Sequence, residues 1–318
     1  MFSFDAYLKE TRDMLVKASI PITSGFEDTT TTYTNAGKVR NQGIEMSLHT
    51  INLTGELGWE TNLTATYNKN KIKDLNSDVP YYINQINNSY VTMLAKDYPI
   101  NVFYGYVTDG IFQNQSEVNT HAVQPGAEPG DIRFIDQNGD GMLDTNDRVK
   151  VGSGTPKVSL GFNINLTYKD FDLVANFYGD FGAKRYNYTK YQLERMDHVF
   201  NYGKNALNAW TPENPDTDIP RAVSGDPNKN SRTSTRFVEN GDYLRLNNLQ
   251  IGYNLPVKYC KKMGLSNLRI YVGATRLFTI TNYKGYDPST GSSVGQMGYD
   301  YAAIPLSRDF MMGLKFGF

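Results

Sequence analysis

Long apolar segments, cysteines and excess charge are all scarce in this chain of 318 residues. No apolar run approaches the roughly 20 residues that a membrane-spanning helix needs, which excludes a helical membrane protein. The single cysteine, Cys260, cannot form an intramolecular disulfide and says nothing about the compartment. A formal net charge of −1 argues against a protein that binds nucleic acid through bulk charge. Residues 1–15 lack a basic stretch followed by an apolar one, so they are not a signal peptide.

What the chain does have is strict alternation of apolar and polar side chains, clearest in residues 157–181. Alternation with a period of two places each set on one face of a strand. A turn at Lys169–Asp170 separates two arms of roughly 11 residues, about the length with which a tilted strand crosses a bilayer. One face carries Val158, Leu160, Phe162, Phe171 and Leu173, and the other carries Ser159, Asn163, Asn165, Asp172 and Asn176. We therefore expect a transmembrane β-hairpin, although a long hairpin of a soluble sandwich would show the same pattern.

The rest of the chain decides between these two folds. Alternating segments recur at 2–8, 44–49, 59–68, 243–255, 268–280 and 310–318, with a slip of phase near Asn247–Asn248 that predicts a β-bulge. Short connections at 52–56, 169–170 and 256–265 alternate with long ones at 16–36, 76–155, 187–235 and 283–304. Outer-membrane barrels alternate short periplasmic turns with long external loops in this way, and sandwiches have no reason to. We expect an all-β fold: an antiparallel transmembrane β-barrel segment of about eight long strands, with long extracellular loops.

Eight strands can close into a small barrel or remain an open curved sheet, and the sequence alone leaves both arrangements open. Six segments bear on this point. They are VRNQGIEMSL (39–48), GDIRFIDQNGDGMLDTNDRVKVGSGTPKVSLGFNINLTYKDFDL (130–173), WTPENPDTDIPR (210–221), GDYLRLNNLQIGYNLP (241–256), LFTITNYKGYDP (277–288) and GLKFGF (313–318). Together, and in this order, they resemble the C-terminal barrel half of the SusC/RagA-type TonB-linked outer-membrane proteins. Arg276 stands where that family usually has Asn, which leaves the facing of the strand there open.

This resemblance implies a function and partners. A complete protein of the family imports oligosaccharides or peptides across the cell outer membrane, is capped by a SusD-like surface lipoprotein, and is driven by the TonB complex through its N-terminal part. The family's barrel also has more strands, surrounded by outer-membrane lipid. Nothing in residues 1–318 resembles the plug domain or a signal peptide, so we expect the C-terminal part of such a barrel, as an incomplete barrel in the form of an open sheet.

An acidic segment, DQNGDGMLDTND at 136–147, fits the loop pattern of calcium-binding EF-hands. The ligands would be Asp136, Asn138, Asp140, the Met142 carbonyl, Asp144 and Asp147, because calcium takes oxygens from alternating positions around a sharp turn at glycine. Asp147 replaces the usual bidentate Glu and has a shorter reach. The alternative is a turn in which Asp and Asn side chains bond their own backbone, with no metal.

No GxSxG, Walker or GxGxxG motif occurs in the strand–helix setting that its chemistry requires, and the histidines belong to no HExxH motif. We therefore expect no enzymatic activity. Two other functions stay open on the residues alone. One is a passive outer-membrane porin without plug or lid, and the other is a secreted, calcium-stabilised β-sandwich that binds a ligand.

Overall fold

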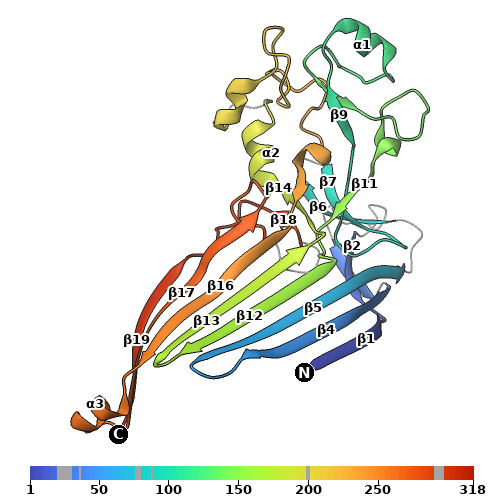
Figure 1. Cartoon of the computed structure of the whole chain (residues 1–318). Helices are drawn as coiled ribbons and strands as arrows, with labels where there is room; N and C mark the ends of the chain where they lie inside the picture. The colour runs from blue at the N-terminus through green and yellow to red at the C-terminus, as the bar shows by residue number, and fades with distance from the viewer. Residues whose placement is uncertain (20–30, 36, 76–79, 87–88, 198–200, 290–296) are drawn as a thin grey trace.

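Eight long antiparallel strands form one curved sheet, and most of the shorter elements gather at one end of it (Figure 1). The computed structural model describes residues 1–19, 31–35, 37–75, 80–86, 89–197, 201–289 and 297–318. The sheet has the order β1-β4-β5-β12-β13-β16-β17-β19. Its strands are β1 (Phe2–Thr11), β4 (Lys38–Leu53), β5 (Leu57–Asp74), β12 (Val158–Tyr168), β13 (Phe171–Phe181), β16 (Tyr243–Asn254), β17 (Asn267–Thr281) and β19 (Asp309–Gly317). The antiparallel all-β class is confirmed, and β4 and β5 extend well beyond the alternating segments at 44–49 and 59–68.

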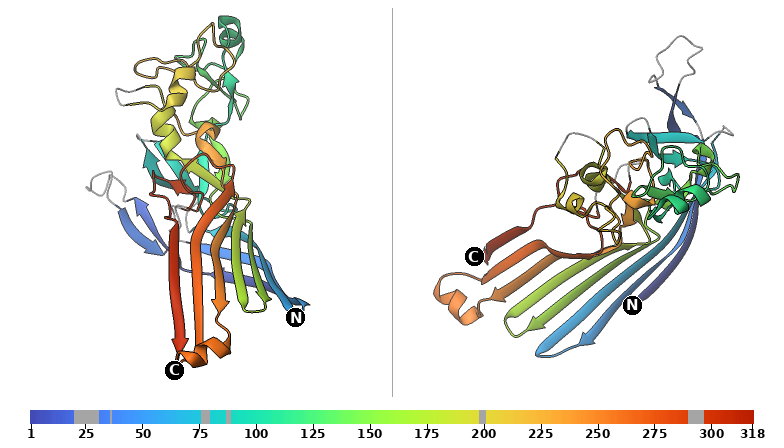
Figure 2. Two further views of the ribbon diagram at one scale, coloured as in Figure 1. Left: turned by 60° about the vertical axis from the view of Figure 1, so that its left-hand side comes forward. Right: turned by 90° about the horizontal axis from the view of Figure 1, so that it is seen from above.

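The sheet is open. Strand β1 pairs only with β4 and strand β19 only with β17, and in the described part of the chain no pairing joins β1 to β19. The two chain ends lie at opposite edges of the curved sheet in both views of Figure 2. Within the described ranges the sheet does not close into a small eight-stranded barrel, and its eight long strands form one sheet rather than the two packed sheets of a sandwich.

The three short turns lie together at one end of the sheet. The pair Tyr168–Leu57 places the β4–β5 turn beside the turn at Lys169–Asp170. The pair Phe171–Tyr253 places the β16–β17 connection, with helix α3 (Val257–Lys262), at the same end. The long connections therefore emerge at the opposite end, as the sequence predicted; some of their residues lie outside the described ranges.

The two faces of the sheet differ sharply in polarity. On one face apolar side chains are well exposed, among them Phe310 at 74% and Met312 at 75% of their maximal area. On the other face polar side chains bond across strands: Ser3 with Ser47 at 2.7 Å, His49 with Asn62 at 2.7 Å, and Ser159 with Asp180 at 2.6 Å. Exposed apolar side chains opposite a hydrogen-bonded polar face are typical of a wall between lipid and an aqueous lumen.

The predicted bulge is present between β16 and β17. Asn247 is skipped in the pairing of β16 with both neighbours, and opposite it β17 accommodates Arg276 and Leu277. Arg276 has a φ of 52°, in the left-handed region that bulges use. Its side chain bonds the Ser307 carbonyl and Asp309, the partner of Thr275 in the ladder, instead of joining the exposed apolar face. The charge at this position is thereby accommodated.

The conventional hydrophobic core lies in the layer of long connections. Buried side chains, such as Phe103, Phe134 and Phe237, pack there into clusters. Short strands build this layer: β2 (Leu15–Ser19), β3 (Thr31–Asn35), β6 (Tyr81–Ile86), β7 (Ser89–Leu94), β8 (Val102–Gly105), β9 (Thr108–Ile111), β10 (Ile132–Phe134), β11 (Val149–Ser153), β14 (Lys184–Asn187), β15 (Val238–Asn240) and β18 (Tyr299–Asp300). Two short helices complete it, α1 (Gln115–Thr120) and α2 (Tyr188–Glu194).

Candidate functional site

Helix α2 forms one wall of a polar cavity in the loop layer. The helix begins after Asn187, whose side-chain oxygen accepts a hydrogen bond from the Lys190 backbone N–H at 2.8 Å. This cap satisfies one of the free donors of the first turn. Tyr191 and Glu194 are buried, and the Tyr191 ring packs edge-on against Phe237 at 5.2 Å. The helix is thus fixed with Lys190 and Glu194 one turn apart at the cavity.

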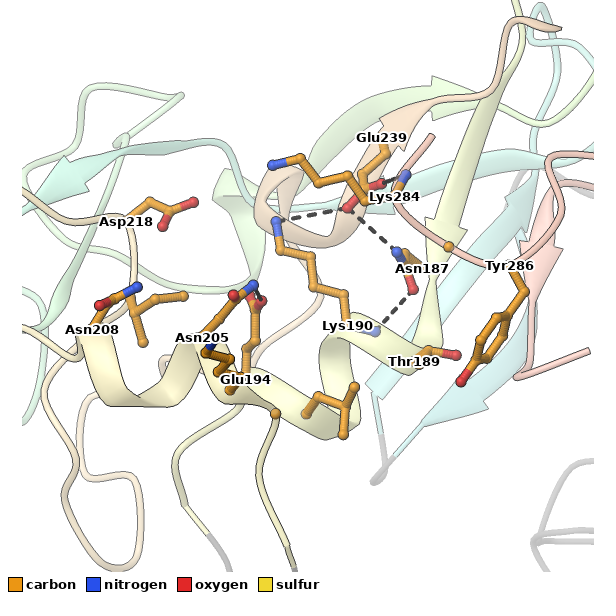
Figure 3. Close-up of a pocket in the computed structure, with 15 residues that line it drawn as sticks. Asn187, Thr189, Lys190, Glu194, Asn205, Asn208, Asp218, Glu239, Lys284 and Tyr286 are labelled. Carbon is orange, nitrogen blue, oxygen red and sulfur yellow. Dashed lines mark hydrogen bonds and ion pairs between the residues drawn. The ribbon is translucent and has the colours of Figure 1, made fainter. Parts of the chain in front are cut away.

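The cavity has a volume of about 420 Å³ and is assembled from distant parts of the chain. Its charged lining residues are Lys190, Glu194, Lys204, Asp218, Glu239 and Lys284. They come from α2, the 3₁₀ turn Lys204–Asn208, the irregular segment that contains Asp218, strand β15 and the segment after β17. Figure 3 shows Lys190 reaching from α2 toward Glu239 and Lys284. No local sequence pattern signals this grouping.

Glu239 holds one side of the cavity together. Its carboxylate lies 3.8 Å from the Lys190 ammonium, and it accepts hydrogen bonds from the Asn187 side chain at 3.4 Å and the Lys284 backbone N–H at 3.0 Å. On the other side, Asn205 donates to Glu194 at 2.8 Å (Figure 3). The cavity wall is therefore a polar network that involves α2, the turn Lys204–Asn208, strand β15 and the segment after β17.

Two of the segments that carried the family resemblance contact one another beside this cavity. Arg221 donates two hydrogen bonds to the buried Asp131, at 2.9 and 3.0 Å, and pairs with Glu128. These carboxylates raise the pKa of the Arg221 guanidinium, Asp131 most strongly. A Cβ at Gly130 would lie 2.4 Å from the Trp210 ring, so only glycine fits there. These residues hold the loop layer in shape.

A second cavity, of about 790 Å³, lies next to the acidic 136–147 segment. Asp144 and Thr145 line it together with Tyr90, Arg148 and Arg232. The Arg148 guanidinium lies over the Tyr104 ring at 4.6 Å and donates to the carbonyls of Tyr90 and Tyr104. The conformation of the acidic segment therefore shapes one wall of this cavity.

The acidic segment folds around its own backbone. Asp136 accepts hydrogen bonds from the N–H groups of Gly139 and Gly141, at 2.7 and 2.8 Å, and those N–H groups, Gly141 foremost, lower the pKa of its carboxyl. The buried Asp147 accepts from the N–H groups of Gln137 and Asp144, both at 2.8 Å. Both glycines have positive φ values, 73° and 82°, which the turn requires.

Three other expected calcium ligands also accept hydrogen bonds from backbone N–H groups through their side chains. Asn138 accepts from the Asp140 N–H, Asp140 from the Met142 N–H, and Asp144 from the Asn146 N–H. Among the residues that the structure describes, no three side chains of Asp, Glu, His or Cys converge in a way that could hold a metal ion. The six residues lie in one compact turn, and calcium binding by Asp136, Asn138, Asp140, Met142, Asp144 and Asp147 stays a prediction.

Comparisons with known proteins agree on one group of relatives. No family model matches the chain. The chain is 34% identical to TonB-dependent receptor P3 of Formosa agariphila, over 99% of this chain and 32% of that receptor. It is 27% identical to TonB-dependent receptor SusC of Bacteroides thetaiotaomicron, over 99% of this chain and 30% of SusC. It therefore spans about a third of the length of the curated relatives it matches.

Solved structures show the same relationship in three dimensions. A structure of the RagAB peptide transporter superposes with a TM-score of 0.78 at 26% identity, covering 99% of this chain and 33% of that one. The RagAB peptide importer in its "open-open" state gives a TM-score of 0.75 at 25% identity, over 100% of this chain and 32% of that one. The names of these relatives describe receptors and transporters, and none describes an enzyme.

Proposed function

The chain is homologous over nearly its whole length to SusC-type TonB-dependent receptors of the outer membrane, and from this premise we propose that it serves nutrient import as part of a longer protein. In this proposal residues 1–318 form the C-terminal part of the barrel wall, and the plug domain belongs to the remainder of the complete protein. The cargo is an oligosaccharide or a peptide, and a SusD-like surface lipoprotein covers the external end.

The observation that carries the proposal is that apolar side chains are exposed on the sheet and buried in the loop layer. The sheet exposes Phe310, Met312 and Ile280 in a way that only lipid can cover at low cost, because each buried CH₂ contributes about 0.8 kcal/mol. The packed core and both larger cavities lie in the loop layer at one end. Such a layer suits capture of a cargo outside the cell and delivery into the barrel.

Dependence on energy distinguishes this proposal from the passive porin. The complete gene is deleted in its source bacterium, and uptake of labelled oligosaccharides and peptides is measured with and without TonB. We expect uptake of one cargo class to be lost in both deletions. Uptake that continues unchanged without TonB would favour the porin, and uptake of every cargo unchanged by the gene deletion would refute import.

A further inference from the structure

Buried polar atoms without a hydrogen-bond partner gather around the cavity beside α2. In the part of the chain that the structure describes, eight buried side-chain atoms lack a partner, and four of them belong to Thr189, Glu194 and Arg236. Thr189 and Glu194 line the 420 Å³ cavity, and Arg236 lines a hollow of about 250 Å³ that shares Lys190 and Asp218 with it. Folded proteins leave only a few such groups unpaired, so this concentration calls for a partner.

Glu194, which lines the cavity, and Arg236, which lines the adjoining hollow, form an incomplete ion pair. Their side chains are only 7% and 6% exposed, and the closest charged atoms, Oε2 of Glu194 and Nη2 of Arg236, are 3.8 Å apart. Nη2 donates to the Glu194 backbone carbonyl at 2.9 Å, while Nε and Nη1 of Arg236 and Oε2 of Glu194 have no hydrogen bond. A guanidinium has five donors and a carboxylate accepts several bonds, so both groups keep unused capacity.

Burial destabilises the charged form of the Arg236 side chain. Desolvation lowers the pKa of the Arg236 guanidinium to about 10, although the nearby Glu194, Asp218 and Asp226 carboxylates favour its charge. Buried charges that are only partly paired are costly, and a ligand that supplies the missing partners recovers that cost.

The charges around the cavity are balanced in sign. The lining includes three lysines and three acidic residues, with Lys190 and Glu194 on α2 and Lys284 and Asp218 from two other segments. Balanced charge at close range selects for a ligand that carries both signs and offers little to a ligand that carries one. Tyr286 is the single aromatic among the described lining residues and is 66% exposed, so the cavity lacks the aromatic platform that covers the apolar face of a sugar ring.

We infer that this cavity and the adjoining hollow bind the charged groups of a zwitterionic cargo, a short peptide, with Glu194 accepting its ammonium group in the cavity and Arg236 and Lys190 pairing with its carboxylate at the hollow. The inference rests on the proposed import function and selects one of its two cargo classes. Charge-assisted hydrogen bonds to Glu194 Oε2 and to the free nitrogens of Arg236 would complete both buried groups. Lys190 borders both hollows, and its exchange of Glu239 for the cargo is a small movement.

The test uses the complete receptor, purified in detergent, and three probes. The first is a tryptic digest of casein, the second is the same digest with its amino groups acetylated and its carboxyl groups amidated, and the third is maltotriose. Retention of each probe is measured by mass spectrometry after gel filtration. We expect the native digest to be retained, the blocked digest to bind at least tenfold more weakly, and maltotriose to pass through.

Substitutions of single residues test which side chains bind the peptide. Glu194→Gln and Lys190→Met should each weaken retention of the native digest about tenfold, and Lys284→Met, which changes an exposed lysine at the rim and keeps the fold, should weaken it less. Glu213→Gln and Lys258→Met change exposed residues outside the cavity and serve as matched controls. A folded receptor is verified for each by its heat-modifiable migration in gels.

The inference would be overturned by equal retention of native and blocked digests, by retention of maltotriose that depends on Lys190 or Lys284, or by no retention of any probe. Equal binding by all cavity variants would do the same. None of these results concerns TonB-dependent uptake in cells, so import can stand while the peptide assignment falls.

Discussion

At the scale of single residues, the side chains of the 136–147 segment fit both a calcium-binding loop and a metal-free turn. The Asp136 carboxylate and the Asn138 and Asp140 side chains all accept backbone N–H groups, which by itself explains why Asp, Asn and Gly occupy these positions. The same bonds leave further lone pairs on each carboxylate, because an ionised carboxyl group offers about four acceptor sites. Calcium binding is therefore compatible with the turn but is not required by it.

The first prediction concerns calcium. Titration of the complete receptor with terbium, and competition by calcium, should give saturable luminescence that is lost in Asp136→Ala with Asp140→Ala and kept in the exposed control Asp216→Ala. The pKa of Asp136 is lowered, so its charge persists as pH falls through the usual range near 3.9, and binding should not weaken between pH 7 and 5 on its account. No calcium-dependent signal at millimolar concentration would leave only the metal-free turn.

A second residue-scale prediction concerns the attachment of a loop to the sheet. Arg245 of β16 donates to Asp287 at 2.7 Å, both side chains are at most 7% exposed, and Ser289 bonds the same two residues. Arg245→Met removes the guanidinium that neutralises the buried Asp287, and loss of one member of a buried ion pair costs about 3–5 kcal/mol. We expect limited proteolysis to cut the chain after β17 much faster in this variant.

The control for that loss is another arginine on the same sheet. Arg269 pairs with Asp172, but these side chains are 24% and 20% exposed, near the turn end. Arg269→Met should cost only up to about 1 kcal/mol, because water replaces the lost contact. Equal protease sensitivity of the two variants would contradict the role assigned to Arg245.

At the scale of the strand, alternation decides which side chains meet lipid. In the β12–β13 hairpin Phe162 lies opposite Phe177 with ring centroids 6.3 Å apart, and Asn163 lies opposite Asn176 on the other face. The two residues are neighbours in sequence and sit at the same depth. They therefore form a matched pair for a substitution.

Phe162→Arg should impair assembly of the complete receptor far more than Asn163→Arg. A charge on the lipid face near the membrane midplane costs about 2–4 kcal/mol, whereas a charge in the aqueous lumen is hydrated. The measurement is the amount of heat-modifiable receptor in isolated outer membranes. Similar amounts of folded protein in the two variants would show that the facing is wrong.

The sequence predicted the β16–β17 bulge in only one of its two strands. The slip of phase at Asn247–Asn248 located the bulge, because the two halves of the strand keep their apolar sets on the same face only if one residue is extra. The matching irregularity in β17 left no such signal. Arg276 is an arginine with a φ of 52°, and only its bonds to Ser307 and Asp309 show how it is accommodated.

At the scale of the whole molecule, the open sheet leaves hydrogen-bonding groups unpaired along the outer sides of β1 and β19. Exposed edges of this kind pair with other chains or aggregate, and lipid cannot satisfy them. The chain expressed by itself should therefore aggregate on refolding into detergent and show no heat-modifiable band, whereas the complete receptor should show one. A stable, heat-modifiable monomer of residues 1–318 would mean that the edges close after all.

The sequence alone determined the wall of this molecule, and the tertiary structure decided its candidate site. The face to which each side chain points, the end of the sheet at which each turn lies and the position of the bulge all follow from residues close together in the sequence. The reason is that side chains alternate between the two faces of a strand, so Val158, Leu160 and Phe162 must share one face. The cavity beside α2 and the hollow adjoining it bring Glu194 and Arg236 close to Lys284, although strands β16 and β17 lie between Arg236 and Lys284 in the sequence. No periodicity links such residues; long-range packing of the loops brings them together, so their shared charges and unpaired atoms exist only in the folded protein.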